Sequence, residues 1–183
     1  MKNAFFVRMI ALVCIGVLFS GHSSAQDDKS KRPSQPAVAT GKIKDATITI
    51  DYSSPSVKGR KIYGGLVPYD KVWRAGANEA TIFTSSKDIE VEGKKLAAGK
   101  YSLFATPGEK EWTIFFNSET GQWGDKQGGA ANMDPAKTVL SVKVKPKDLK
   151  EVQEKLLYTI VDKDMESGFA ISWEKTRVFV SVK

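Results

Sequence analysis

Apolar and polar residues alternate with a period of two along most of the chain beyond residue 42. This is the repeat of a β-strand, because successive side chains of a strand point to opposite faces of a sheet. The alternation recurs in short runs such as ATITIDY, KYSLFAT, EWTIFFN, TVLSVKVK, FAISWEK and RVFVSVK. About nine or ten short strands of this kind predict an all-β fold, an antiparallel, jelly-roll-like β-sandwich, with a closed β-barrel as the alternative.

Turn-forming residues separate the alternating runs and predict hairpins. The three clearest turns are PGEK at residues 107–110, VEGKKL around Gly93, and DKDMESG at residues 162–168. Only PKDLKEVQEKLL, at residues 146–157, has the composition of a helix, and we expect at most one short helix there. The Gly-rich stretch at residues 121–135 predicts a long mobile loop.

The first 25 residues have the parts of a secretory signal peptide. Lys2 and Arg8 precede an apolar run, MIALVCIGVLF, that is too short to span a bilayer, and small residues follow at the cleavage site. We therefore expect residues 1–25 to be removed and the protein to be exported to the periplasm of a Gram-negative envelope or secreted, with no transmembrane segment left. The polar QDDKSKRPSQPAVAT predicts a disordered tether at residues 26–41, before a single domain at residues 42–183.

Loss of the signal peptide would remove the only Cys, Cys14, and the only His, His22. A chain without thiol or imidazole lacks disulfides, the usual zinc, copper, haem and iron–sulfur ligand sets, and His-assisted nucleophiles. We therefore expect no metal, no cofactor and a binding protein rather than an enzyme. Lys and Arg fall from 28 to 26 against 21 acidic residues, so the net charge becomes 26 − 21 = +5. These charges are spread along the chain, which does not predict a nucleic-acid partner.

One segment departs from the strand pattern. KVWRAGANEAT, at residues 71–81, brings an aromatic, a cation, an amide and a carboxylate together. One interpretation is a binding site in which Arg74 binds a carboxylate or phosphate, Trp73 forms an apolar floor, and Asn78 and Glu79 orient the ligand.

The same segment also fits a structural corner. In this interpretation Arg74 forms an ion pair with Glu79 or Asp51 beneath the loop. Gly76 and Asn78 would then adopt positive φ angles in a tight reversal of the chain. Both interpretations are left open here.

Three residues outside this segment extend the candidate ligand site. In YSSPSVKGRKIYGG, the adjacent cations Arg60 and Lys61 follow a Ser-rich loop and are able to bind an anion, although the loop also has ordinary turn composition. Trp123 stands in the Gly-rich stretch, where an exposed Trp is able to stack on a sugar ring.

Several segments are similar to a known family. YSSPSVKGRKIYGGLVPYDKVWRAGANEAT, GKKLAAGKYSLFATPGEKEWTIFFN, QWG and SWEKTRVFVSV resemble exported bacterial proteins catalogued as domain of unknown function 2911, from about residue 46 to the end. The resemblance implies an exported β-rich domain and supplies no reaction. This chain has Ala97 where the family usually has Pro before AG, and DKQGGAA replaces an aromatic-rich stretch after QWG. If that stretch closes over a site in the family, the site here is more open or lost.

We expect an exported domain that binds a small polar or anionic envelope ligand, a glycan or a peptide, on a wall formed by residues 53–81. One alternative is a carboxylate-dependent hydrolase of glycans, with Glu79 or Asp51 as the base and two carboxyls facing each other across a cleft. The other is a structural or assembly protein of the envelope, whose sheet edges are guarded by Lys143, Lys145 and Lys183. The oligomeric state is left open.

Overall fold

The computed structural model describes residues 28–163 and 166–183, so the signal peptide expected at residues 1–25 lies outside the described residues. The fold is an antiparallel β-sandwich, and none of the described sheets closes into a barrel. The sandwich prediction is therefore confirmed, and the barrel alternative is not. In the described part of the chain, no helix has the length and apolar character needed to cross a membrane.

Ten strands and two short 3₁₀ helices follow one another along the described residues. They are η1 (Lys29–Lys31), β1 (Gln35–Ile43), β2 (Ala46–Ser54), β3 (Thr81–Ser85), β4 (Ile89–Val91), β5 (Lys94–Leu96), β6 (Gly99–Thr106), β7 (Trp112–Asn117), η2 (Pro135–Lys137), β8 (Thr138–Val144), β9 (Pro146–Lys163) and β10 (Glu166–Ser181). The three predicted turns join β4 to β5, β6 to β7, and β9 to β10, and each of these pairs is an antiparallel hairpin.

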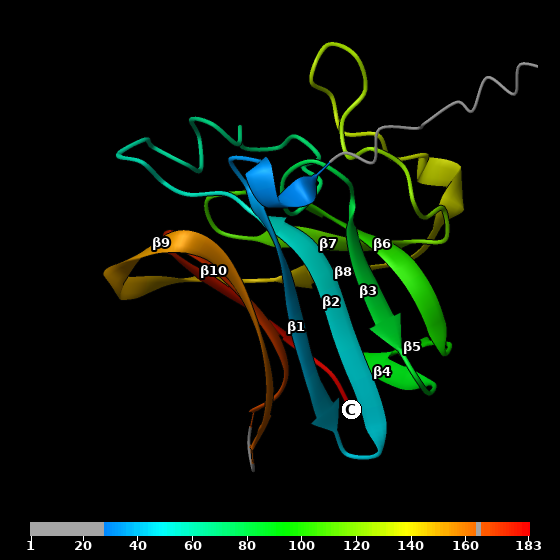
Figure 1. Cartoon of the computed structure of the whole chain (residues 1–183). Coiled ribbons are helices and arrows are strands. Elements are labelled where there is room, and N and C mark those ends of the chain that lie inside the picture. Colours follow the sequence, from blue (N-terminus) through cyan, green and yellow to red (C-terminus); the bar gives the residue numbers. More distant parts are fainter. Residues whose placement is uncertain (1–27, 164–165) are drawn as a thin grey trace, which may run out of the picture.

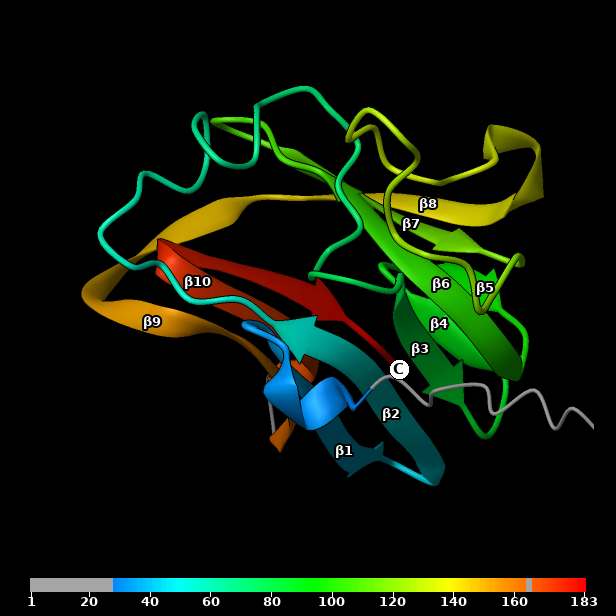
Figure 2. The ribbon, with the colours of Figure 1, turned by 45° about the horizontal axis from the view of Figure 1, so that its top comes forward.

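Two layers enclose the core. One is a six-stranded sheet in the order β1-β2-β3-β6-β7-β8, and the other contains the long β9–β10 hairpin, whose β10 faces the first sheet in Figure 2. The β4–β5 hairpin continues the second layer, because Glu90 and Lys183 exchange two backbone hydrogen bonds of 2.8 and 2.9 Å. Lys183 is thus paired, which corrects its expected role as a guard of a free sheet edge.

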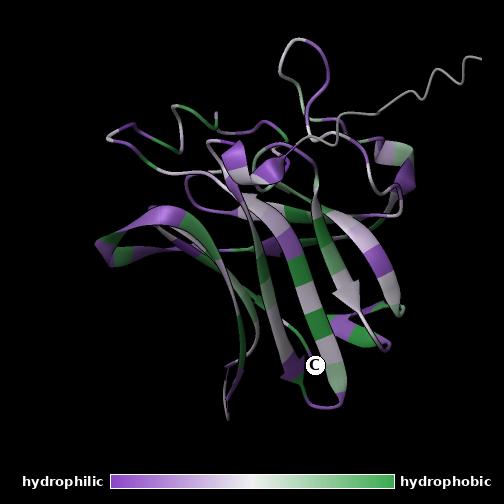
Figure 3. Cartoon of the chain, viewed as in Figure 1, coloured by the Kyte–Doolittle hydropathy of each residue, from purple (hydrophilic) through white to green (hydrophobic). Residues whose placement is uncertain are grey.

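The alternation in the sequence decides which face of each strand is buried, as the hydropathy colours along β2 show in Figure 3. Ile48 and Ile50 of β2 are fully buried, and the exposed Thr47 and Asp51 belong to the opposite parity. In β10 the parity changes, because Phe169, Ile171 and Trp173 are buried and then Val178, Val180 and Val182. The change occurs at Glu174, which has a φ of 55° and lies between two register shifts.

The helix expected at residues 146–157 is wrong, because these residues are part of β9. Backbone hydrogen bonds hold this segment on both sides. On one side it pairs with β10, and on the other Val57 N donates to Glu154 O and Leu156 N to Pro55 O, at 2.8 and 2.9 Å. Tertiary pairing therefore overrides a local composition that favours a helix.

The disordered tether expected at residues 26–41 also needs correction. Residues 35–41 belong to β1, which pairs with β2 without interruption from Gln35↔Ser54 to Ile43↔Ala46, and η1 precedes it. The core-facing residues in this part of β1 include Ala37 and Ala39, which pack against the core as small side chains. Small apolar residues give a weak alternation, so the strand resembled a polar linker in the sequence.

Three segments gather at one end of the sandwich in Figure 1. They are η1, the connection between β2 and β3, and the connection between β7 and β8. The candidate site residues lie on the two connections, so this end of the molecule is where a ligand site is expected.

Candidate functional site

The connection between β2 and β3 lines a cavity of about 320 Å³. We call it the basic cavity, because the charged side chains among its described lining are Arg60, Lys71, Arg74 and Asp125. Three cations and one carboxylate give this lining a net charge of 3 − 1 = +2. Its apolar wall includes Trp73 and Trp173, so the cavity combines positive charge with an aromatic surface.

Trp73 and Trp173 stack against each other, with ring centroids 5.9 Å apart and an angle of 19° between the ring planes. The indole of Trp73 is fixed by a hydrogen bond, since its Nε1 donates to the Gly76 carbonyl at 3.1 Å. The Nε1 of Trp173 is buried and has no acceptor among the described residues. Trp73 was expected to form the apolar floor of a ligand site, and the structure places it in the cavity lining with 8% of the residue exposed. Its stacking with Trp173 was not foreseen from the sequence.

Arg74 pairs with Asp125, and not with Glu79 or Asp51 as expected. Its NH1 donates to Oδ2 of Asp125, which lies in the connection between β7 and β8. Its Nε is buried without an acceptor in the described part of the chain. Burial lowers the pKa of Arg74, yet a guanidinium keeps its charge in proteins. The pair thus links two loops at the wall of the basic cavity and leaves one N–H of the cation unused.

Gly124 makes the contact between these loops possible. A Cβ at this position would lie 2.1 Å from Cδ of Arg74 and 2.8 Å from the carbonyl oxygen of Asn78. Only a residue without a side chain fits there, because real Cβ atoms do not approach other atoms so closely. In the Gly-rich connection between β7 and β8, Gly124 is therefore the glycine that allows the backbone to pack closely against Arg74.

The three other cations near the site differ in how they are held. Arg60 is anchored by two backbone carbonyls, since Nε donates to Val57 O at 3.0 Å and NH2 to Ser56 O at 2.6 Å. Lys71 is exposed and has no charge partner among the described residues. Lys61 is exposed and does not belong to the described lining of the cavity, so the structure does not bring it to the site. Lys71 lines the cavity but was not among the predicted site residues. It is the first residue of KVWRAGANEAT, so its position in that segment was the signal that could have identified it.

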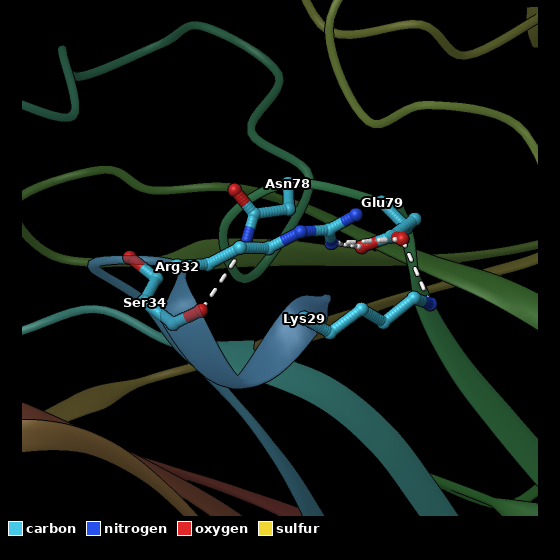
Figure 4. Close-up of polar contacts among 5 residues, drawn as sticks. All are labelled: Lys29, Arg32, Ser34, Asn78 and Glu79. Carbon is cyan, nitrogen blue, oxygen red and sulfur yellow. Dashed lines mark hydrogen bonds and ion pairs between the residues drawn. The ribbon is translucent and has the colours of Figure 1, made fainter. Parts of the chain in front are cut away.

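Asn78 and Glu79 bind the N-terminal segment of the chain (Figure 4). NH1 of Arg32 donates to both carboxylate oxygens of Glu79, at 2.9 and 2.8 Å, and Nζ of Lys29 lies 2.9 Å from Oε1. Nδ2 of Asn78 donates to the Ser34 carbonyl at 3.1 Å. Neither side chain belongs to the described lining of the basic cavity, so residues 53–81 do not form the single ligand-binding wall that was expected. Asn78 and Glu79 form a separate group of contacts with Lys29 and Arg32, which we call the clamp.

The clamp changes the ionisation of Glu79. Partial burial opposes the charged form, but the hydrogen bonds from Lys29 and Arg32 outweigh it and lower the pKa to about 2. Trp123 lies beside the clamp, with the Arg32 guanidinium 5.6 Å from its ring centroid. The ring is 50% exposed, as expected for this residue, yet it contacts Arg32 and is not among the described residues of the cavity wall.

The segment at residues 71–81 is also a fixed corner, as the second interpretation predicted. Asn78 has the expected positive φ of 59°, but the other left-handed residue is Ala75, with a φ of 53°, and not Gly76. The carbonyl of Ala75 accepts hydrogen bonds from Thr81 Oγ1 at 3.0 Å and from the Tyr158 hydroxyl at 2.7 Å. The corner is thus tied to β3 and β9, and it presents Trp73 and Arg74 to the cavity.

The carboxylates proposed for a hydrolase, Asp51 and Glu79, line a different cavity of about 450 Å³ beside β1 and β2. The hydrolase alternative gave Glu79 or Asp51 the role of the base, and a base works best with a pKa near the operating pH. Glu79 is paired with two cations that lower its pKa to about 2, so its carboxylate is a weak proton acceptor at neutral pH. The geometry around Glu79 therefore favours a structural ion pair.

Comparisons with known proteins identify a family for this chain but do not indicate an activity. The model of a family described as "Protein of unknown function (DUF2911)" matches residues 34–182. This match confirms the resemblance that the sequence motifs showed. No curated protein matches the chain, and no solved structure matches it.

Proposed function

The chain belongs to the DUF2911 family, and we propose that it is an exported, non-catalytic domain that binds a small anionic ligand in the basic cavity. The observation that carries the proposal is the gathering of Arg60, Lys71 and Arg74 around one cavity beside stacked tryptophans. In the rest of the described chain, Lys and Arg side chains serve mostly as exposed surface charges.

The electrostatics of the cavity favour an anion. Asp125 offsets Arg74, while Lys71 and Arg60 have no carboxylate partner among the described residues. A carboxylate or phosphate in the cavity would gain from both cations, and partial exclusion of water strengthens such contacts. A neutral ligand would gain nothing from this charge.

The remaining features favour an anion that carries a ring or a short chain. The volume of about 320 Å³ lies at the lower end of small-molecule sites. Trp73 and Trp173 belong to the cavity lining but are only 8% and 1% exposed, so their indole edges give a narrow apolar contact for the apolar part of a sugar or of a peptide side chain. An acidic sugar or a short peptide with a free carboxylate, both found in bacterial envelopes, meets these requirements.

Isothermal titration calorimetry at low ionic strength tests the proposal. We expect glucuronate, as the sugar probe, or N-acetyl-dialanine, as the peptide probe, to bind, and neutral glucose to bind at least about tenfold more weakly because it lacks the charge. Lys71→Ala is expected to weaken binding by about tenfold, and Lys100→Ala, an exposed lysine on β6, to change nothing.

Two results would overturn the proposal. One is the absence of binding for both anions, and the other is an unchanged affinity in Lys71→Ala. Lys71 is exposed and makes no ion pair with a described residue, so we expect this variant to fold as the wild type does. Comparison of the two probes also decides between an acidic sugar and a peptide.

Export is part of the proposal and rests on the composition of residues 1–25. N-terminal sequencing of protein recovered from the periplasm or the medium is expected to begin at Gln26. A chain that begins at Met1 and remains in the cytoplasm would contradict this part, without affecting the binding measurement.

A further inference from the structure

A third and smaller hollow, of about 230 Å³, lies next to the aromatic part of the core. We call it the acidic hollow. Its described lining includes Tyr63, Tyr69, Glu109, Trp112, Asp148 and Thr176, and it shares no described lining residue with the basic cavity. It is therefore a separate feature, formed where the connection after β2 meets β7, β9 and β10.

The charge of this hollow is opposite to that of the molecule. Lys and Arg outnumber Asp and Glu by 28 to 21 in the full sequence, yet the described lining holds two carboxylates and no Lys or Arg. Glu109 and Asp148 are exposed, and neither has an ion pair or a side-chain hydrogen bond with a described residue. A third carboxylate, Glu174, lies close enough to act on Tyr63. The described lining of the hollow therefore carries two carboxylates that form no ion pair with a described residue.

Tyr63 supplies an independent observation that points to a ligand. Its ring is packed edge-on against Trp112, Trp73 and Trp173, with centroid distances of 4.8, 6.2 and 6.2 Å, and only 5% of the residue is exposed. Its hydroxyl has no hydrogen-bond partner among the described residues, and it keeps some contact with solvent, since it is absent from the sealed polar atoms that lack a partner. Tyr63 also belongs to the described lining of the acidic hollow.

The hydroxyl is present in its neutral form. Burial raises the pKa of Tyr63, and the nearby Glu174 and Tyr69 raise it further. A neutral phenol has an oxygen lone pair that is able to accept a hydrogen bond from a cation. An acceptor held in place by a buried ring, with unpaired carboxylates beside it, is an arrangement suited to an N–H donor that carries positive charge.

We propose that the acidic hollow binds an organic cation, a primary ammonium or guanidinium group, between the Tyr63 hydroxyl and the carboxylates of Glu109 and Asp148. Tyr69, which is half-buried in the lining, offers a ring surface that attracts both a positive charge and the methylene groups of a short alkyl chain. The described residues contain no group of three side chains able to hold a metal ion, so an organic cation fits the site better than a metal. Amines of peptides, amino sugars and polyamines share this chemistry.

Nuclear magnetic resonance tests the site directly. The indole N–H signal of Trp112, identified through the variant Trp112→Phe, is followed while n-butylammonium chloride, methylguanidinium chloride or neutral n-butanol is added. The two cations are expected to shift this signal in a saturable manner, and n-butanol is not. The comparison of the two cations decides between an ammonium and a guanidinium group.

Three variants remove one contact each. Asp148→Asn and Glu109→Gln are each expected to weaken n-butylammonium binding by about fivefold, and Tyr63→Phe by a similar factor, because each loses one charge-assisted contact. Glu119→Gln, an exposed carboxylate outside the hollow, is the matched control and is expected to bind as the wild type does.

The inference is overturned if n-butylammonium causes no saturable shift, or if Asp148→Asn and Glu109→Gln both bind as the wild type does. The two carboxylates are exposed, so these variants keep the test decisive even if Tyr63→Phe disturbs the core. Lys71→Ala, which tests the basic cavity, is expected to leave n-butylammonium binding unchanged, so failure of one site is distinguished from failure of the other.

Discussion

Arg74 and Glu79 lie five residues apart in the sequence, but each has its charge partner in a different segment. Arg74 pairs with Asp125, and Glu79 pairs with Lys29 and Arg32. The sequence indicated that these charges are paired, because they crowd into one segment, but proximity in sequence suggested the wrong partners. Asp125 lies in the loop between β7 and β8, whose sequence has no strand alternation from which its position could be predicted. Its ion pair with Arg74 therefore depends on how the whole chain folds.

The ion pairs of Glu79 predict an acid-dependent loss of stability. The folded-state pKa of about 2 lies below the ordinary value of 4.5, so the stabilisation is complete above pH 4.5 and is lost as the pH falls toward 2. Because the carboxylate is 33% exposed, solvent screening reduces the effect, and we expect Glu79→Gln to lower the free energy of unfolding by about 1–2 kcal/mol at pH 7. Urea unfolding across this pH range measures it.

The difference between wild type and Glu79→Gln should disappear near pH 2. Glu111→Gln is the control, because Glu111 forms an exposed pair with Lys143 at 2.7 Å and is expected to cost about 0.5 kcal/mol or less. A difference for Glu79→Gln that stays constant from pH 7 to pH 2 would mean that its ion pairs are not the cause.

Gly124→Ala is expected to disrupt both the packing and the cavity. The added Cβ would meet Cδ of Arg74 and the backbone of Asn78, and we expect a loss of about 1–3 kcal/mol in the free energy of unfolding together with loss of glucuronate binding. Gly121→Ala is the control, since it has open space around it and a φ of 86°, so it should cost about 1 kcal/mol through backbone strain alone and leave binding intact. Equal binding in the two variants would show that the contact between Gly124 and Arg74 is not needed.

At the scale of elements, the alternating runs predicted most strands and all three hairpins, because period and turn chemistry are local properties. Two elements were missed for physical reasons. β9 has a composition that favours a helix and becomes a strand only because Pro55, Val57 and β10 pair with it. β1 faces the core with small alanines, so its pattern was too weak to recognise.

The change of parity in β10 was visible in the sequence, since FAISWEK and RVFVSVK bury residues of opposite parity. The structure shows both runs in one strand, with Glu174 at the left-handed φ of 55° between them. Glu174→Gly and Glu174→Ala both remove the carboxylate, and only Gly adopts this φ without strain. We therefore expect the Gly variant to be more stable than the Ala variant by about 1–2 kcal/mol in urea unfolding.

The same pair of substitutions at Lys100, an exposed residue of β6 that pairs with Thr84 and has no positive φ, should give the opposite order, because Gly weakens an ordinary strand position. If Ala is as stable as Gly at position 174, the left-handed conformation is not what allows β10 to change its buried face.

At the scale of the whole molecule, the sandwich places its functional candidates at one end and leaves its sheets to build the core. The basic cavity depends on four separate parts of the chain, since Arg74 and Asp125 come from two connections, Trp173 from β10, and Ser34 from the segment before β1. The segment at residues 71–81 pointed to this region, and the structure places Arg60, Trp73 and Arg74 in the lining of one cavity. Trp173 and Asp125 were not predicted there, because only the assembled layers bring them to the cavity.

Chemical-shift mapping of the backbone amides with glucuronate or N-acetyl-dialanine tests the central claim most directly, because it reports where on the molecule an anion binds. We predict saturable shifts confined to the parts that line the basic cavity, namely Ser34, residues 55–77, residues 125–129 and the region of Trp173. Shifts that appear elsewhere, or no saturable shift with either anion, would contradict the claim.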